Sequence, residues 1–326
     1  MSIRSLLLTS PLLVSFAFPL GAVTITLDYT YDTGNFFGSS GSAQRTSLEA
    51  ARDFFQNTID QDFNAINPTG SQTWTAAFLN PATGDLETIV DLVVPENEII
   101  IYVGGRNLGG STLGQAGAGG FTTANFSDPL RGDSAAKYAL WGGSASFDSS
   151  GTTWNFDLGG PAPSTSDFYS VALHELAHVL GLSANNDAWN DHWVPGNDPI
   201  ADGNPGTLGQ FTGVNAVAAY NADNALAASF VPTVAAILDD PSTTGPGNNE
   251  EDLTNRHFEE GTQSFIYGTT SLQEAAMDPN LTQGTRKEFT NVDIGAFQDI
   301  GWLIIPEPTS AALLILGSLF ALRRRR

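Results

Sequence analysis

The chain has 326 residues, no cysteine and four histidines, and it carries 13 basic against 35 acidic side chains. Its length is sufficient for a sizeable hydrophobic core, and the absence of cysteine excludes disulfides and thiolate metal ligands. Without the end segments described below, 8 basic and 34 acidic residues remain, for a net charge near −26. Such an acidic domain argues against nucleic acid or an anionic membrane as a partner.

The first 22 residues have the three parts of a secretory signal. Arg4 gives a basic start, an apolar centre follows, and small residues end at Ala22. This arrangement predicts export and cleavage near Ala22. A membrane anchor is the alternative, but the apolar run is short and is interrupted by Pro11 and Pro19.

From residue 23 onward, strand and helix patterns are mixed, which predicts an α+β fold. Residues 23–31 alternate as a strand, and residues 47–59 have helical spacing behind a serine cap. Residues 86–94 and 98–103 form two further strand patterns. The glycine-rich chain at 104–120 is too irregular for a phosphate-binding loop, and we expect a mobile surface segment there.

The most informative residues are His174, Glu175 and His178, which form a His-Glu-x-x-His pattern in an apolar run. Side chains four apart lie above one another on a helix, so the two histidines can offer nitrogens to one ion. Glu175 lies about 100° around the helix, where it can reach a water bound to that ion. The pattern predicts a zinc site with Glu175 as general base. The alternative is an apolar core helix that carries two histidines without a metal.

A catalytic zinc site needs a third protein ligand, and the sequence offers several. Gly181 allows the helix to end in a left-handed turn, which can bring in a ligand from farther along the chain. His192 and His257 are the remaining histidines, and nearby carboxylates are further candidates: Asp187 and Asp191.

The run from His174 to Gly181 resembles the zinc helix of the metzincin metallopeptidases, whose longer pattern ends with a histidine three residues after the glycine. This chain has Ala184 there, and alanine cannot bind zinc. In leishmanolysin-like metzincins a long insertion precedes the third histidine, which lies shortly before a methionine turn. His257 and Met277 resemble that arrangement. The resemblance therefore implies that His257 is the third ligand, with residues 183–259 as the insertion.

Two further stretches carry the same resemblance. Residues 138–148 resemble the edge strand that lies above the zinc in matrixin-type metzincins and pairs with an extended substrate, although a plain edge strand is the alternative. Residues 289–302, with a threonine cap near their start, resemble the C-terminal helix of metzincin domains. The resemblance implies a twisted mixed sheet with an edge strand over the zinc cleft. Candidate caps stand just before the zinc helix: Ser164, Ser166 and Asp167.

The insertion contains acidic loops rich in Gly, Pro and Asn around one apolar segment, residues 214–237, which predicts one or two helices. Carboxylates in such loops could hold structural Ca²⁺, with solvated loops as the alternative. The candidate ligands are Asp198, Asp202, Asp239, Asp240, Glu250, Glu251 and Asp252.

The C-terminal end combines Pro306-Glu-Pro308, an apolar run over 311–322 and four arginines at 323–326. The apolar run falls short of the ~20 residues of a spanning helix. Together these parts resemble the Pro-Glu-Pro sorting signal that exosortase-type transpeptidases process in Gram-negative bacteria that make exopolysaccharide. That resemblance implies an exosortase-type partner and an exopolysaccharide or biofilm-matrix setting. An ordinary tail anchor is the alternative, and both interpretations place the catalytic domain outside the cytoplasm.

We therefore expect a signal peptide at 1–22, an N-terminal catalytic subdomain at 23–182, an irregular C-terminal subdomain at 183–303 and a sorting or membrane segment at 304–326. The expected function is an exported or surface-attached zinc metalloendopeptidase that acts on protein or peptide. One alternative is a non-catalytic matrix or adhesion protein with a degenerate metzincin fold. The other is a zinc hydrolase of a different amide bond. Tyr267 is a distant candidate for stabilising the oxyanion.

Overall fold

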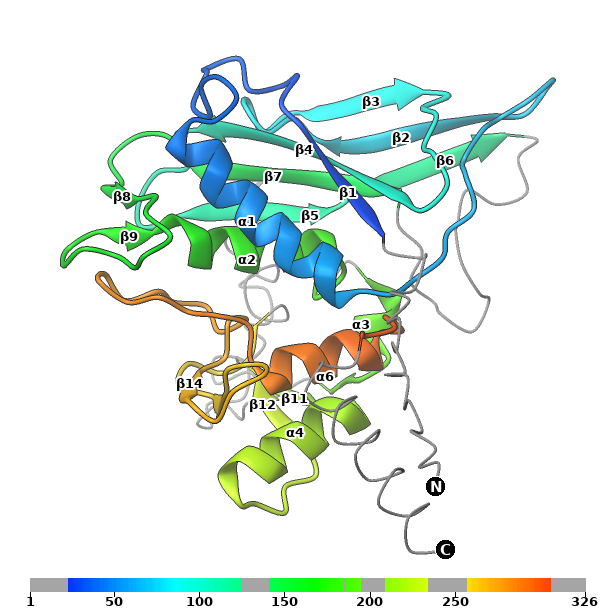
Figure 1. The fold of residues 1–326 in the computed structure, drawn as a ribbon. Helices are drawn as coiled ribbons and strands as arrows, with labels where there is room; N and C mark the ends of the chain where they lie inside the picture. Colours follow the sequence, from blue (N-terminus) through cyan, green and yellow to red (C-terminus); the bar gives the residue numbers. More distant parts are fainter. Residues whose placement is uncertain (1–22, 125–140, 184–185, 195–208, 234–256, 306–326) are drawn as a thin grey trace, which may run out of the picture.

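A computed structural model describes residues 23–124, 141–183, 186–194, 209–233 and 257–305. It confirms an α+β fold in two halves, with sheets and two helices above and shorter elements below (Figure 1). The predicted signal, the chain from residue 306 onward, Ala184 and the calcium candidates lie outside the described residues.

A four-stranded mixed sheet is the centre of the upper half. Its order is β1 (Thr24–Asp28), β4 (Glu98–Arg106), β7 (Gly142–Asp148) and β5 (Gly114–Ala118). The first three strands are parallel, and β5 runs antiparallel to β7. The strands predicted at 23–31 and 98–103 are thereby confirmed, with β4 extending three residues farther.

Two predictions about this sheet are wrong. Residues 142–148 do not form an edge strand, because β7 pairs with β4 on one side and β5 on the other. The edge strand on the β7 side of the sheet is β5, whereas β1 is the edge strand on the opposite side. Strand β5 lies in the glycine-rich chain for which a mobile surface segment was expected, and this chain also contains the start of β6 (Gly120–Ala124). Glycine shows no alternation of side chains, yet its peptide groups form the same ladder as those of any other residue.

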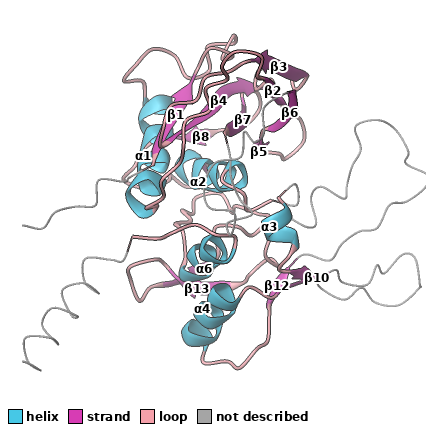
Figure 2. Ribbon diagram, turned by 90° about the vertical axis from the view of Figure 1, so that its right-hand side faces the viewer, coloured by secondary structure: helices cyan, strands magenta, loops and turns pink. Residues whose placement is uncertain are grey.

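Both faces of the central sheet are covered, which explains the apolar run of β4. Ile99, Ile101 and Val103 point into a core shared with α1 (Ala43–Thr58) and α2 (Phe168–Val179). Ile100 and Tyr102 point the other way, into a second cluster. That cluster also contains side chains of β2 (Thr73–Leu79). Strand β2 is the middle strand of a second, three-stranded sheet, between β3 (Leu86–Val90) and β6 (Figure 2). The sequence patterns identified β3 but not β2.

Helix α1 begins earlier than its hydrophobic spacing indicated. The hydroxyl of Ser42 accepts a hydrogen bond from Arg45 N at 3.3 Å, so Ser42 is the cap and Ser47 lies on the buried face. Helix α1 packs against both β1 and α2. It therefore packs beside α2, the helix that carries His174, Glu175 and His178.

The lower half is built around α4 (Val214–Asn224) and α6 (Asn291–Asp299). Gly295 of α6 lies so close to the Ala216 backbone that a Cβ there would overlap it, which brings the two helices into tight contact. The carboxylate of Asp299 accepts from Asn215 N and Ala216 N at 2.9 Å and so caps α4. Phe289 packs edge-on against Phe55 of α1, and Phe297 packs against the same ring at a tilt, which joins both halves in one core.

Short elements complete the described chain. Helix α4 and the capped α6 confirm the helices predicted within 214–237 and 289–302. The remaining elements are β8 (Trp154–Asn155), β9 (Ser166–Asp167), α3 (Asp187–Asn190), β10 (Trp193–Val194), β11 (Gly209–Phe211), β12 (Val231–Thr233), β13 (Gln263–Phe265) and β14 (Leu272–Glu274).

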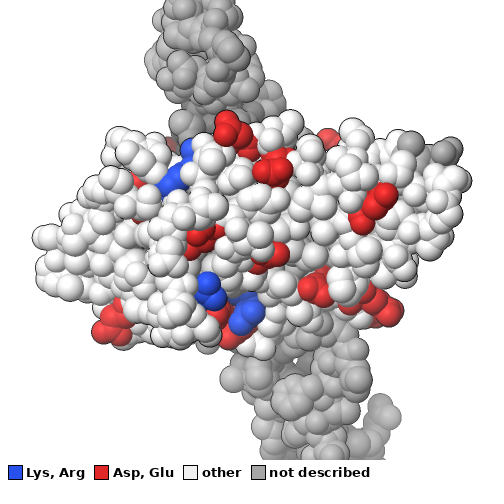
Figure 3. Space-filling model, turned by 90° about the horizontal axis from the view of Figure 1, so that it is seen from above, with Lys and Arg blue, Asp and Glu red and all other residues white. Residues whose placement is uncertain are grey.

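The acidic composition is visible on the surface. On the face above the second sheet, acidic side chains are spread widely and basic ones are few (Figure 3). Three basic groups of the described chain have carboxylate partners: Arg52 pairs with Asp53, Arg286 pairs with Asp167, and Lys287 pairs with both Glu274 and Asp278. This face therefore offers no basic patch for a nucleic acid.

Candidate metal centre

The helix with the His-Glu-x-x-His pattern, α2, is fixed at both ends by hydrogen bonds. At its start Asp167, one of the predicted caps, accepts from Ser170 N at 3.2 Å. Arg286 donates two hydrogen bonds to the same carboxylate, at 2.9 and 2.8 Å. At its end Gly181 has φ +106°, the left-handed turn predicted for it. The helix that carries the histidines is therefore positioned by the lower half of the molecule as well as by the sheet.

Hydrogen bonds also fix the two histidine rings of α2. His174 Nδ1 lies 2.7 Å from Ala276 O, and His178 Nδ1 lies 2.7 Å from Leu182 O. A carbonyl oxygen only accepts, so each Nδ1 carries a proton, and in its neutral form each ring presents an unprotonated Nε2. Both Nε2 atoms are thus in the form that binds a metal.

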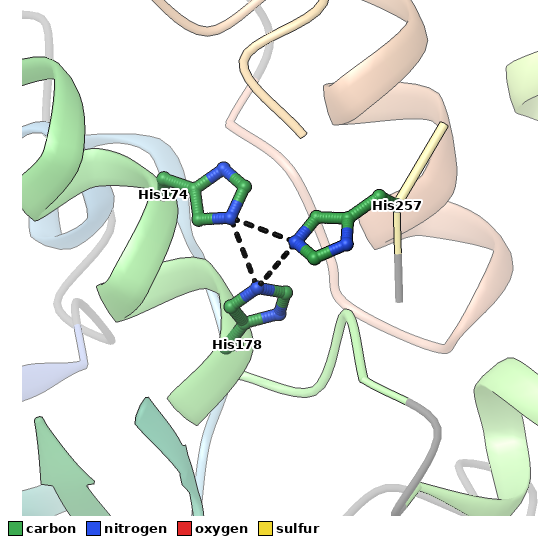
Figure 4. A group of neighbouring side chains, drawn as sticks. All are labelled: His174, His178 and His257. Carbon is green, nitrogen blue, oxygen red and sulfur yellow. Dashed lines mark hydrogen bonds between the residues drawn. The ribbon is translucent and has the colours of Figure 1, made fainter. Parts of the chain in front are cut away.

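His257 completes the group from a distant part of the chain. Its backbone position is set by the next two residues, because Phe258 N donates to Met277 O at 2.9 Å and Glu259 N donates to Pro232 O at 3.0 Å. Its Nε2 lies 3.0 Å from Nε2 of His174 and 3.2 Å from Nε2 of His178, which are themselves 3.0 Å apart (Figure 4). The three imidazoles form one group that could bind a metal ion.

The chemistry of this group fits a cation. Two of the three nitrogens present lone pairs, and a proton on His257 Nε2 could satisfy only one of them. Three ligands of a tetrahedral zinc, at bonds of about 2.0–2.1 Å, lie about 3.3–3.4 Å apart, only slightly more than is seen. Desolvation lowers the pKa of His174 to about 4, so its ring is neutral near pH 7 and no proton competes for Nε2.

The side chain of Glu175 extends from α2 toward the edge strand β5. It is 5% exposed, and its carboxylate rests against the backbone of Gly114, where an added Cβ would overlap it. Helix α2 packs along β5 as well as β7. Gly114 of β5 thus leaves room for the side chain of Glu175, the acidic residue of the His-Glu-x-x-His pattern.

The turn that contains Met277 is connected to the three histidines through the carbonyl of Ala276, which accepts from His174. Asp293 of α6 is fully buried, and its carboxylate accepts from Ala276 N at 2.9 Å and Met277 N at 3.1 Å. The same carboxylate accepts from Thr290 N and completes a capping box. Burial raises the pKa of Asp293 against these hydrogen bonds. Asp293 thereby holds the peptide whose carbonyl orients His174.

The structure does not bring the other predicted ligands to this group. His192 Nε2 donates to Asp299 O at 2.9 Å, and its ring lies beside Phe211. Asp187 and Asp191 lie in and directly after α3 and are not members of the group. The hydroxyl of Tyr267, the candidate for stabilising an oxyanion, donates to Ile305 O at 3.3 Å.

The described residues contain a second group of possible metal ligands, formed by Glu260, Glu274 and Asp278. The buried ammonium of Lys287 lies among them: it donates to Asp278, pairs with Glu274 at 3.0 Å and donates to Asn280 O at 2.6 Å. Desolvation raises the pKa of Asp278 to about 6. A side-chain cation therefore already pairs with two of these three carboxylates.

Several residues that shape the metal centre escaped the sequence patterns. Gly114, Ala276 and Leu182 act through backbone or through the absence of a side chain, which leaves no residue signature. Asp293 had a signal, because a threonine followed three residues later by an acidic residue is a capping pattern. Its second set of hydrogen bonds, to the turn at 276–277, is a tertiary contact.

Within the described chain, no helix has both the length and the apolar composition to cross a bilayer. No protein-family model matches the sequence. No curated protein matches it either.

Proposed function

We propose that the protein is an exported zinc metalloendopeptidase of metzincin type, with His174, His178 and His257 as ligands and Glu175 as general base. The observation that carries the proposal is the convergence of three Nε2 atoms within 3.2 Å, two of them with their lone pairs held inward. Three imidazoles with a fourth position left open are the ligand set of a catalytic zinc.

When bound, zinc supplies a Lewis acid that polarises the substrate carbonyl and lowers the pKa of water toward ~7. Glu175 takes the proton from the attacking water and later delivers it to the leaving amine. Glu175 follows His174 directly on α2, and its carboxylate rests against Gly114 of the edge strand, which supports this role. The Nδ1 hydrogen bonds of the two helix histidines keep their rings oriented throughout.

The edge strand supports a polypeptide as substrate. Leu113 O accepts a hydrogen bond from Asp148 N, and Gly142 O accepts one from Gly119 N. In an antiparallel pair every second residue directs its N–H and C=O at the partner strand, so the odd-numbered residues from 113 to 119 form the hydrogen bonds with β7. The peptide groups of Gly114, Ala116 and Ala118 therefore face outward, where no other described strand pairs with them. An extended peptide can add to such an edge through its main chain.

The ends of the chain support export. The first 22 residues have the pattern of a secretory signal, and the Pro-Glu-Pro segment with its apolar run and arginines resembles an exosortase-type sorting signal. We propose that the enzyme is released or held at the cell surface, in an exopolysaccharide or biofilm-matrix setting, with the C-terminal segment removed on maturation.

The test compares the wild-type chain with Glu175→Gln for zinc content and for cleavage of casein. We expect about one zinc per chain in both proteins and a loss of cleavage of about 10²–10⁴-fold in the variant, the usual range for a general base. Glu259→Gln, two residues after His257, is the control and should leave cleavage within twofold of wild type. Zinc binding without cleavage by the wild type would favour a non-catalytic matrix protein. Cleavage that survives Glu175→Gln would remove Glu175 from the mechanism.

A further inference from the structure

The end of α2 determines where the acceptor for His178 lies. Gly181 N donates to His178 O at 3.2 Å and Leu182 N donates to Ala177 O at 3.0 Å, the pair of hydrogen bonds of a Schellman turn. This turn reverses the chain so that Leu182 O reaches His178 Nδ1 at 2.7 Å. The orientation of the His178 ring therefore depends on the peptide groups between 180 and 182.

One of these peptide groups is held from outside the helix. The indole Nε1 of Trp302 donates to Leu180 O at 2.9 Å, and this bond is buried. Leu180 O is one of the carbonyls that a helix end leaves without an intrahelical donor. The bond fixes the plane of the Leu180–Gly181 peptide, which directly precedes the turn to Leu182.

Trp302 is itself held rigidly. It follows α6, where a second turn of the same kind places it: Trp302 N donates to Phe297 O at 3.0 Å, and Gly301 has φ +112°. The indole is 3% exposed and packs edge-on against Phe63 with ring centroids 5.7 Å apart. Because Trp302 is held in place directly after α6, its hydrogen bond to Leu180 O fixes the end of α2 relative to α6.

We propose that Trp302 is a positioning residue of the metal centre, acting through Leu180 and the Leu182 carbonyl on His178. The proposal rests on the metal-binding function proposed above. It adds that one helix holds both carbonyls that orient the rings: Asp293, near the start of α6, accepts from Met277 N and so holds the Ala276–Met277 peptide, whose carbonyl orients His174. Trp302, after its end, holds the turn that orients His178.

If Trp302 contributes only to stability, its replacement should lower the stability of the fold without a specific loss of zinc affinity; a positioning role predicts both effects. Trp74 provides the matched control, because it is 1% exposed and its Nε1 also donates to a backbone carbonyl, Leu92 O, at 2.9 Å. It belongs to the second cluster, which contains side chains of β2, and not to the core that contains α2. Trp302→Phe and Trp74→Phe each remove one buried indole donor and keep an aromatic ring.

The experiment measures zinc affinity of the full chain by competition with a chromophoric chelator, the visible spectrum of the Co²⁺ form, and the urea midpoint of the metal-free form. We expect both variants to lower the midpoint to a similar extent. Only Trp302→Phe should weaken zinc binding, by about five- to tenfold, which is below the 10–100-fold loss typical when a direct partner of a ligand is removed. It should also change the Co²⁺ spectrum.

Zinc affinities of the two variants within twofold of each other, with unchanged Co²⁺ spectra, would overturn the positioning role while leaving the proposed function intact. A wild-type chain that binds neither Zn²⁺ nor Co²⁺ would overturn both. If Trp302→Phe does not fold, Trp302→Tyr gives the same comparison, since its side chain is larger than that of Phe by a hydroxyl group and has no indole donor.

Discussion

Replacement of His257 by alanine tests the metal centre most directly. His257 supplies one of the three converging Nε2 atoms, and it is the one that does not come from α2. Structural zinc sites with four ligands bind with about 10–16 kcal/mol, so one ligand corresponds to about 2.5–4 kcal/mol. We therefore expect His257→Ala to weaken zinc binding by a factor of about 10²–10³.

The control is His192→Ala, which removes the other histidine outside α2. His192 donates one hydrogen bond to Asp299 O, so its loss should cost about 1 kcal/mol of stability and leave zinc affinity within twofold of wild type. Zinc affinity is measured for both variants by chelator competition at pH 7.5, with the urea midpoint as a check on folding. Wild-type zinc affinity in His257→Ala, or an equal loss in His192→Ala, would refute the assignment of the third ligand.

Two further changes probe the general base and the buried carboxylates. Gly114→Ala places a Cβ onto the Glu175 carboxylate, whereas the Cβ of Gly117→Ala, on the same strand, meets nothing within 4 Å. We expect casein cleavage to fall about tenfold or more in Gly114→Ala only, with zinc affinity unchanged in both variants. Equal cleavage by the two variants would contradict the role of the Gly114 contact. Asp278 has its folded pKa raised from 3.8 to about 6, so its contribution to stability is complete below pH ~4 and is lost as pH rises through 6. Asp278→Asn should remove this part of the pH dependence in urea unfolding between pH 4 and 6.5, and an unchanged slope would show that the pKa of Asp278 is not raised.

The local features of the candidate site followed from the sequence because they depend on short-range geometry. Residues four apart share a face of a helix, which puts His174 and His178 together whatever the rest of the chain does. The left-handed turn at Gly181 and the threonine cap of the last helix, at Thr290, depend likewise on neighbouring residues.

The edge strand shows where local patterns fail. A strand at 142–148 was expected at the edge, yet whether a strand is central or peripheral depends on which other segments pair with it. The edge strand next to it, at 114–118, consists of glycine, glutamine and alanine and has no alternating pattern. Its identity as a strand comes from backbone hydrogen bonds with a partner some thirty residues away.

By itself, the sequence determined an α+β chain with two candidate metal-binding histidines and a carboxylate on one helix, and it limited the candidates for a third ligand to a few residues. The tertiary structure decided that His257, and not His192, lies with the other two imidazoles. It also decided which carbonyls orient the rings and which strand borders Glu175. The physical reason is range: helix periodicity and capping act over a few residues, whereas His174 and His257 meet across 83 positions through the packing of α6 and its turns.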